Sequence, residues 1–580
     1  MTLTRRQAAR LISAGALVAA APPKIPGTPD PSPEVTVFEA AKIITMERSR
    51  PSARFVATQG GLILAVSQTL AELAPWTDGR RVTLNRQFAD KILLPGLIDP
   101  HVHPVQAAVM LNLPFIAPDD WELPTGHFPG SRTPHAWRAR LKELLAASAD
   151  TPFICWGYHE LFHGALDRAE LDRLAPDRPV IIWQRSFHEV IVNSAALNAW
   201  GLGTPQAFAA AVAQLQADPA HADFARGLLS ETALSVALAK LRPIIFAPER
   251  MTRGMSLMQQ MLRARGVTTV SDMATGIFAG FEAEAALIKA AFSGAQSAAR
   301  VMLMPFAAQM PDATLPEAWL EAARARFEGP NVGLDRRVKL FADGAFFAQN
   351  MRMGPPGYTD GHVGKWLTEP PVLKAQMDRF WAAGFSLHIH VNGDEGLDVV
   401  LTHLASLPPR ASQSVTLEHL GYATEAQNRR IAQLGLMVSA QPNYIRVLGD
   451  AYGTHGLGAD RAAVMNRLGS LEARGVPLGL HSDFNMAPID PLYLAWIAAN
   501  RITIDGRVKA PEERLSLDKA LRAITIEAAE VIGMDAKIGS IAPGKRADFA
   551  VLDRDPYQAG AAALRDLRVA GVIFEGRVAR

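Results

Sequence analysis

Cysteine is almost absent from this sequence, since Cys155 is the one cysteine among 580 residues. The chain can therefore form no internal disulfide and no thiolate cluster, and any bound metal must be held by nitrogen and oxygen atoms. An excess of one charge is also lacking, with 59 basic residues against 57 acidic ones. That balance, without a basic patch interleaved with aromatic residues, argues against nucleic acid or an acidic membrane as a partner. The 49% of hydrophobic residues suffices for a large folded core.

Long hydrophobic runs are missing as well. The apolar stretch over residues 8–21 is shorter than the roughly 20 residues that span a bilayer, so we expect no membrane span. It follows Arg5 and Arg6 and ends before a pair of prolines. A basic start, a short apolar run and small residues are typical of a secretory signal, and adjacent arginines are typical of the twin-arginine export machinery. We predict an export signal over residues 1–22, a linker over residues 23–34, and a periplasmic or secreted protein.

The two ends of the remaining chain both resemble short β-strands separated by glycine-rich turns. Neither end alone can bury a sheet face. We therefore predict that residues 35–90 and residues 535–580 pair into one small β-sandwich domain. Two separate appendages are the alternative.

Between these ends, short apolar runs alternate with helical patterns, as expected for parallel strands buried on both faces. The runs cover residues 93–98, 267–270, 301–306, 338–341, 385–391, 415–417, 436–440 and 476–480. Eight such units predict an α/β fold, a (β/α)₈ barrel of the TIM type over residues 91–534. The gap after the first run is too long for one crossover helix. Residues from about 104 to 262 are therefore predicted to be an insertion over the barrel mouth, with a helix over residues 136–147 and a β-like patch over residues 180–183.

The strongest chemical signal is the segment PGLIDPHVH, residues 95–103. Positions i and i+2 of a strand point to the same face, so His101 and His103 project together. Two imidazoles at the C-terminal end of a barrel strand lie where this fold places its active sites. His101 and His103 are therefore candidate metal ligands.

This segment resembles the first-strand motif of the amidohydrolase superfamily, and the whole chain resembles the amidohydrolase-3 group of metal-dependent hydrolases. The resemblance covers nearly everything after the export signal, including the two-part β-domain and the long insertion. It implies a metal-dependent hydrolase, and each further ligand is carried over only where a motif matches.

Three more ligands are implied by this resemblance. Lys339 opens the motif KLFADG, whose lysine is taken to be carboxylated in the family and to bridge two cations. That modification would turn a costly buried cation into an anionic ligand. The alternative is an ordinary lysine that reaches solvent or pairs with Asp343. The pattern His-x-x-Gly-Asp falls on His390, and the family's next single histidine falls on His419.

Asp483 matches the aspartate that completes the superfamily's site, where it touches a metal and takes a proton from the attacking water. The alternative role for an aspartate after an apolar strand is to cap the following helix. Asp483 is therefore predicted to be both a metal ligand and the catalytic residue.

Four further residues are predicted on the substrate side of the site. His188 resembles a histidine of the family's insertion that reaches towards the site, and Tyr158 offers a phenolic hydroxyl. His388 lies one layer deeper than His390, where packing or hydrogen bonding is its main expected role. Asp343 is expected to support Lys339 or to line the pocket.

Together these residues predict metal-assisted hydrolysis of a carbon–nitrogen bond, in an amide or cyclic amide of a small molecule. Zinc suits imidazole and carboxylate ligands, and a bound divalent cation lowers the pKa of water from about 15.7 to about 7. The state of Lys339 decides between one and two ions. Deamination, ester hydrolysis and a non-hydrolytic isomerisation or elimination stay open, as does an inactive exported metal-binding protein. The sequence decides neither the substrate nor the oligomeric state.

Overall fold

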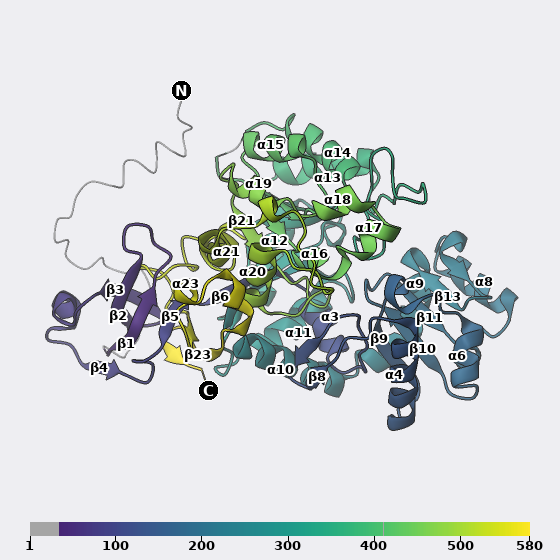
Figure 1. The fold of residues 1–580 in the computed structure, drawn as a ribbon, viewed down its shortest axis with the longest axis horizontal. Helices are drawn as coiled ribbons and strands as arrows, with labels where there is room; N and C mark the ends of the chain where they lie inside the picture. Colours follow the sequence, from purple (N-terminus) through teal and green to yellow (C-terminus); the bar gives the residue numbers. More distant parts are fainter. Residues whose placement is uncertain (1–33, 410, 580) are drawn as a thin grey trace.

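The computed structural model describes residues 34–409 and 411–579, which form three regions (Figure 1). A sheet built from both ends of the described chain lies on one side, parallel strands surrounded by helices lie in the middle, and the insertion lies on the other side. The predicted export signal, residues 1–22, and nearly all of the predicted linker fall outside the described residues and stay predictions. Within the described ranges, no helix is both long and apolar enough to cross a membrane.

The two ends of the described chain join in one eight-stranded sheet. Strand β5 (Ile92–Pro95) is the junction, because it runs parallel to β1 (Val35–Ile44) and antiparallel to β22 (Phe549–Leu552). The remaining strands and short helices are β2 (Ser52–Gln59), β3 (Leu62–Ser67), β4 (Val82–Asn85), β23 (Val569–Phe574), β24 (Arg577–Val578), α2 (Ala74–Thr77) and α23 (Pro556–Ala559). The predicted pairing of the two ends is therefore present, while the sandwich form stays a prediction because strand pairing gives a single sheet.

The first apolar run, residues 93–98, is divided between two sheets, whereas the sequence predicted one barrel strand there. Strand β5 ends in the terminal sheet, and β6 (Leu97–Val102) begins the parallel core. Gly96 lies between them, and a Cβ at this position would lie 2.0 Å from Oγ1 of Thr268 on the neighbouring strand. The absence of a side chain at Gly96 therefore allows the chain to pass from one sheet to the other.

Replacing Gly96 with alanine is expected to lower the free energy of unfolding by about 1–3 kcal/mol, the usual cost of forcing extra volume into a packed core. Gly294→Ala is the matched control, because nothing lies within 4 Å of its added Cβ. Chemical denaturation of both variants measures the difference. An unchanged midpoint for G96A would mean that Thr268 moves aside without cost.

Two parallel sheets form the middle of the molecule. One has the order β16-β15-β14-β6 and the other β17-β18-β19-β20-β21. Two isolated parallel bridges connect the sheets, one from Val102 in β6 to Phe484 and one from Phe306, directly after β15, to Lys339. Every predicted apolar run contributes a strand to this mixed α/β core: β14 (Val267–Thr275), β15 (Arg300–Pro305), β17 (Arg337–Phe341), β18 (Ser386–Val391), β19 (Val415–His419), β20 (Met437–Ala440) and β21 (Leu478–Leu480), beside β6 and the additional β16 (Val332–Leu334).

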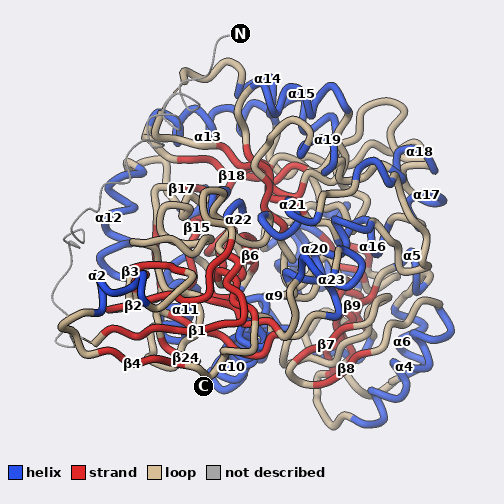
Figure 2. The backbone as a smooth tube through the Cα atoms, turned by 60° about the vertical axis from the view of Figure 1, so that its left-hand side comes forward, coloured by secondary structure: helices blue, strands red, loops and turns tan. Residues whose placement is uncertain are grey.

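Helices surround these strands (Figure 2). Several begin with proline, whose fixed φ suits a first helical turn, and α15 begins with a capping box formed by Thr424 and Gln427. The helices are α11 (Phe281–Phe292), α12 (Pro316–Phe327), α13 (Pro370–Ala382), α14 (Asp394–Leu404), α15 (Glu425–Gln433), α16 (Asn443–Leu448), α17 (Ala451–His455), α18 (Ala459–Ala463), α19 (Leu468–Glu472), α20 (Pro491–Asn500), α21 (Leu517–Arg522) and α22 (Ile526–Val531).

The insertion folds around a five-stranded sheet of its own, in the order β12-β13-β11-β10-β9. Helix α4 (Pro134–Ala147) and strand β10 (Val180–Gln184) lie where the sequence predicted a helix and a β-like patch. The other elements are β7 (Trp121–Leu123), β8 (Gly126–Phe128), β9 (Phe153–Tyr158), β11 (Glu189–Val192), β12 (Ala222–Asp223), β13 (Leu228–Ser230), α5 (Glu160–His163), α6 (Arg168–Leu174), α7 (Ser194–Ala199), α8 (Pro205–Gln214) and α9 (Leu234–Ile245).

The two helices that flank the insertion pack against each other. A Cβ at Gly254 of α10 (Pro248–Ala264) would lie 2.0 Å from the carbonyl oxygen of Ala108 on α3 (Pro104–Met110). Glycine at this crossing therefore lets the two backbones approach. The insertion leaves the core after α3 and returns to it through α10.

Candidate metal centre

The first and last strands of the parallel core are joined at their C-terminal ends. Asp99 on β6 accepts hydrogen bonds from the backbone N–H of Ser482, at 3.2 Å, and from its hydroxyl, at 2.5 Å. The N–H of Asp483 donates to the carbonyl oxygen of His101 at 3.0 Å. We call these contacts of Asp99 and His101 with Ser482 and Asp483 the seam. The seam holds Asp483 next to His101, which lies in β6, and His103, which follows it.

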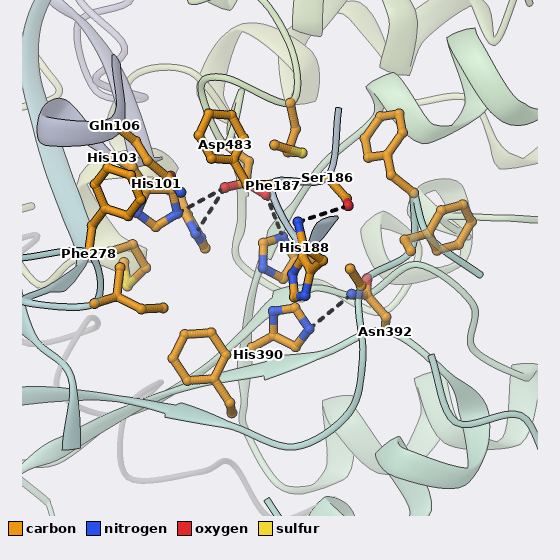
Figure 3. Close-up of a pocket in the computed structure, with 18 of the residues that line it drawn as sticks. His101, His103, Gln106, Ser186, Phe187, His188, Phe278, His390, Asn392 and Asp483 are labelled. Carbon is orange, nitrogen blue, oxygen red and sulfur yellow. Dashed lines mark hydrogen bonds and ion pairs between the residues drawn. The ribbon is translucent and has the colours of Figure 1, made fainter. Parts of the chain in front are cut away.

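His101, His103 and Asp483 form one group of candidate ligands (Figure 3). Nε2 of His103 lies 3.1 Å from Oδ1 of Asp483, and Nε2 of His101 lies 3.5 Å from the same oxygen. One donor atom from each of the three residues lies within 4.8 Å of the other two. Two imidazoles and a carboxylate are a donor set that binds zinc in proteins, so these residues fit a divalent cation.

His419 and His390 extend this group along the same cavity wall. Nδ1 of His419 lies 3.7 Å from Oδ2 of Asp483 and 3.1 Å from Nε2 of His481. The rings of His390 and His419 are 4.5 Å apart between centroids, and Asn392 lies 3.2 Å from Nε2 of His390. All five ligands predicted besides Lys339 therefore line one cavity.

The backbone is strained at two of these residues. His419 has a φ of 72° and Asp483 a φ of 50°, in the left-handed region that residues other than glycine seldom adopt. Such a conformation costs about 1–3 kcal/mol and is concentrated at functional sites. Strict alternation along β19 would point Glu418 and His419 to opposite faces, yet both side chains contact His101. The turn at His419 explains how its ring reaches the cavity.

Lys339 lies in the same cavity wall and is fully buried. Its Nζ is without a hydrogen-bond partner among the described residues. Burial lowers the pKa of Lys339 to about 8, although the charges of Glu418 and Asp483 oppose that effect. An amine that loses its proton readily, and whose nitrogen has no partner, fits a lysine that carries an added carboxylate.

Burial also holds the imidazoles in the neutral form that coordinates metals. It lowers the pKa of His390 to about 3, and it lowers the pKa of His101 and His419 well below the ordinary value. For Asp483 burial raises the pKa, but the hydrogen bond with His103 and nearby positive charge outweigh it, so the pKa is lower than usual. The site therefore combines neutral nitrogens with an ionised carboxylate.

These groups face a cavity of about 250 Å³. The rest of its wall is mainly aromatic and aliphatic, and it consists of Phe187, Leu234, Leu238, Met273, Ile277, Phe278, Phe341, Ala345, Phe346, Phe347, Tyr444 and Met486, with Gln106, Ser186, Glu231 and Asn392. Among the described residues of this wall there is no arginine. The cavity thus offers a reactive polar end and an apolar remainder.

His188 also lines this cavity and comes from the insertion, as the sequence predicted. Its Nδ1 lies 2.9 Å from Oε2 of Glu231, whose Oε1 accepts a hydrogen bond from Asn350 at 3.0 Å. Burial lowers the pKa of His188, but Glu231 and neighbouring carboxylates outweigh it, so the pKa is higher than ordinary. His188 is therefore suited to donate a hydrogen bond or a proton to a molecule in the cavity.

The structure places Tyr158 and Asp343 outside the cavity wall that the described residues form, so a substrate contact of either residue stays a prediction. The hydroxyl of Tyr158 donates to the carbonyl oxygen of Gly164 at 2.6 Å, and its ring packs against Trp137 in the core of the insertion. The carboxylate of Asp343 accepts three backbone N–H groups, from Arg352, Asn392 and Gly393, at 2.8–2.9 Å. Asp343 therefore anchors the loop after β18.

His388 likewise lies behind the cavity wall, and its partner is a residue that the sequence analysis missed. Nδ1 of His388 lies 2.7 Å from Oε1 of Glu418, whose Oε2 lies 2.8 Å from Nδ1 of His101. Glu418 is fully buried. The sequence does contain a signal for this role, because Glu418 is a glutamate within an apolar strand and directly precedes the candidate ligand His419. A second carboxylate, Asp272, lies 4.0 Å from Nδ1 of His103.

Known proteins resemble this chain in sequence and in fold. The sequence profile of the amidohydrolase family matches residues 89–580. N-substituted formamide deformylase from Arthrobacter pascens is 26% identical over 561 residues, which is 92% of this chain and 96% of that protein. The putative amidohydrolase YtcJ of Bacillus subtilis is 24% identical over 422 residues, or 71% and 76% of the two chains. The structure of an uncharacterized metal-dependent hydrolase from Pyrococcus horikoshii has a TM-score of 0.66 at 20% identity, covering 90% of this chain and 98% of that one. Because the profile spans most of the sequence, this chain belongs to the amidohydrolase family.

Proposed function

We propose that this amidohydrolase cleaves a carbon–nitrogen bond other than a peptide bond in a small molecule, with one or two divalent cations. The observation that carries the proposal is the convergence of His101, His103 and Asp483, whose donor atoms lie within 4.8 Å of one another at the cavity. The relative from Arthrobacter pascens, which is named for the deformylation of N-substituted formamides, supports the choice of bond.

Zinc is the cation that we propose, because neutral imidazoles and carboxylates are among its usual ligands. His101, His103 and Asp483 would hold one ion, and Lys339, His390 and His419 would hold a second. For this role the Nζ of Lys339 attacks carbon dioxide, a nitrogen–carbon bond forms and a proton leaves, so that the amine becomes an anionic carbamate. When bound, such cations polarise a carbonyl group and make water acidic enough to attack it.

Asp483 and His188 would move the protons of the reaction. Asp483 accepts a proton from the attacking water and returns it to the departing amine, a role that suits an ionised carboxylate beside His103. His188, held by Glu231, donates a hydrogen bond to the carbonyl oxygen of the substrate. An inactive metal-binding protein would leave the proton-accepting role of Asp483 unused.

Deamination, ester hydrolysis and non-hydrolytic reactions on the same site are the alternatives. They differ from the proposal in their products, so mass spectrometry of reactions with matched formamides, esters and aryl amines decides between them. Release of formate and a free amine from the formamide supports the proposal. Activity that is confined to the release of ammonia from the aryl amine, or of an alcohol from the ester, supports an alternative.

We also propose that the parallel core is a closed (β/α)₈ barrel and that residues 1–22 direct export. The two parallel bridges between the sheets, Val102 to Phe484 and Phe306 to Lys339, support the closure. The arginine pair before an apolar run supports export.

The apolar wall predicts a preference for substrates without a negative charge. N-formylphenethylamine and N-formylphenylalanine differ only by one carboxylate. Burying that carboxylate without a partner is costly, and no described residue of the wall offers a guanidinium. We expect kcat/KM to be at least about tenfold higher for the neutral compound, a difference of about 1.4 kcal/mol in transition-state binding. Equal or faster cleavage of N-formylphenylalanine would contradict this preference.

A further inference from the structure

A chain of four side chains leads from the metal centre into the core. Nη1 of Arg337 lies 3.1 Å from Nε2 of His388, and Nδ1 of His388 lies 2.7 Å from Oε1 of Glu418. Oε2 of Glu418 lies 2.8 Å from Nδ1 of His101. The four residues come from the strands β17, β18, β19 and β6. Each carboxylate oxygen of Glu418 therefore faces one imidazole.

The donor and acceptor roles among these four side chains are fixed by Arg337 at one end and by the carboxylate of Glu418. A guanidinium can only donate, so Nε2 of His388 accepts, and a neutral His388 carries its proton on Nδ1. A carboxylate can only accept, so Glu418 receives one N–H from His388 and one from His101. The proton of His101 is thereby placed on Nδ1, and its bare Nε2 faces Asp483 at 3.5 Å.

The fold makes room for the guanidinium that starts this chain. Gly533 follows α22 with a φ of 72°, and a Cβ at this position would lie 1.6 Å from Nη2 of Arg337. The side chain of Arg337 can reach His388 only because position 533 has no side chain.

We propose that Glu418 is a positioning residue that sets the tautomer of His101, while Arg337 sets the tautomer of His388 on the other side of Glu418. An imidazole coordinates a metal through the nitrogen that carries no proton, so this tautomer leaves Nε2 of His101 available as a ligand. That effect on metal binding rests on the proposed metal-dependent function. The tautomer itself is a property of the protein without metal, so it can be tested separately.

Glu418→Gln gives the sharpest test, because an amide has one accepting end and one donating end. Arg337 still requires His388 to donate from Nδ1, so the amide oxygen must face His388. The NH₂ group then faces Nδ1 of His101, which must accept, and the proton of His101 moves to Nε2. In the double variant R337M/E418Q, His388 is free to change its tautomer and the amide can turn, so His101 can again donate from Nδ1.

The tautomers are read from the nitrogen chemical shifts of histidine-labelled, metal-free full-length protein, with His101→Gln used to assign the signals. We expect the proton on Nδ1 in wild type, on Nε2 in E418Q and again on Nδ1 in R337M/E418Q. Zinc affinity, measured by competition with a chelator, should fall about 10- to 100-fold in E418Q and largely return in the double variant. Melting temperatures of the metal-free proteins report folding, and R337L/E418Q replaces the double variant if it does not fold.

If the second substitution restores zinc affinity, the loss in E418Q came from the changed tautomer of His101 and not from general damage to the fold. Removing Arg337 adds no contact to the metal centre that could restore affinity in another way. A His101 proton that stays on Nδ1 in E418Q overturns the role of Glu418, and one that stays on Nε2 in the double variant overturns the role of Arg337. Zinc binding to wild type tests the proposed function independently: a wild type that binds no zinc overturns that function, while the tautomer shifts still decide the role of Glu418.

Discussion

Replacing Asp483 with asparagine is expected to lower kcat/KM by about 10²- to 10⁴-fold, the range that general acid–base groups contribute. Asparagine keeps the size of the side chain and an oxygen near His103, but it cannot accept the proton of the attacking water. Activity on a neutral formamide, measured at saturating zinc, checks this result. The loss should therefore persist when the metal content equals that of wild type.

Asp398→Asn is the matched control, because this exposed carboxylate pairs only with Arg430 on the surface in the described contacts. It should leave kcat/KM within about twofold, since surface ion pairs contribute little. Full activity of D483N with normal zinc content would remove Asp483 from the mechanism.

Removal of metal is expected to have an effect of similar size. Dialysis against a chelator should lower activity by at least about 10²-fold, because the metal contributes several kcal/mol of transition-state stabilisation, and added zinc should restore it. Activity that survives complete removal of metal would refute the proposed chemistry.

The number of bound ions reports the state of Lys339. Elemental analysis should give a ratio near two zinc ions per chain in wild type and near one in K339A. The substitution removes one of the three groups proposed to hold the second ion, whereas His101, His103 and Asp483, proposed to hold the first, are kept. An unchanged ratio in K339A would exclude Lys339 as a ligand.

Most of the candidate centre could be predicted from the sequence because its residues lie at or near the C-terminal ends of strands. His101 and His103 share a face by simple alternation, His390 lies near the end of its apolar run, and His419 and Asp483 follow theirs. All five line the same cavity. Lys339, which lies inside β17, lines it too.

Residues whose position depends on distant neighbours could not be predicted in this way. Tyr158 ends a strand next to a glycine, but it packs inward because α4 brings Trp137 against its ring. Glu231 meets His188 across a loop of the insertion, 43 positions away. Local periodicity contains no information on either contact. The same limit explains the first apolar run, where a single glycine sends one continuous stretch into two sheets.

The seam has a consequence for the order of events during synthesis. Asp99 and Ser482 are 383 positions apart, so the last ligand emerges from the ribosome long after His101 and His103. Contacts of such long range form late in folding. The proposed zinc ion would need both ends of the seam and would stabilise only the finished domain, because binding free energy accrues to the state that holds the complete set of donors. Nascent or truncated chains that end before this strand would gain no such protection, and metal retention would mark the chains that folded to completion.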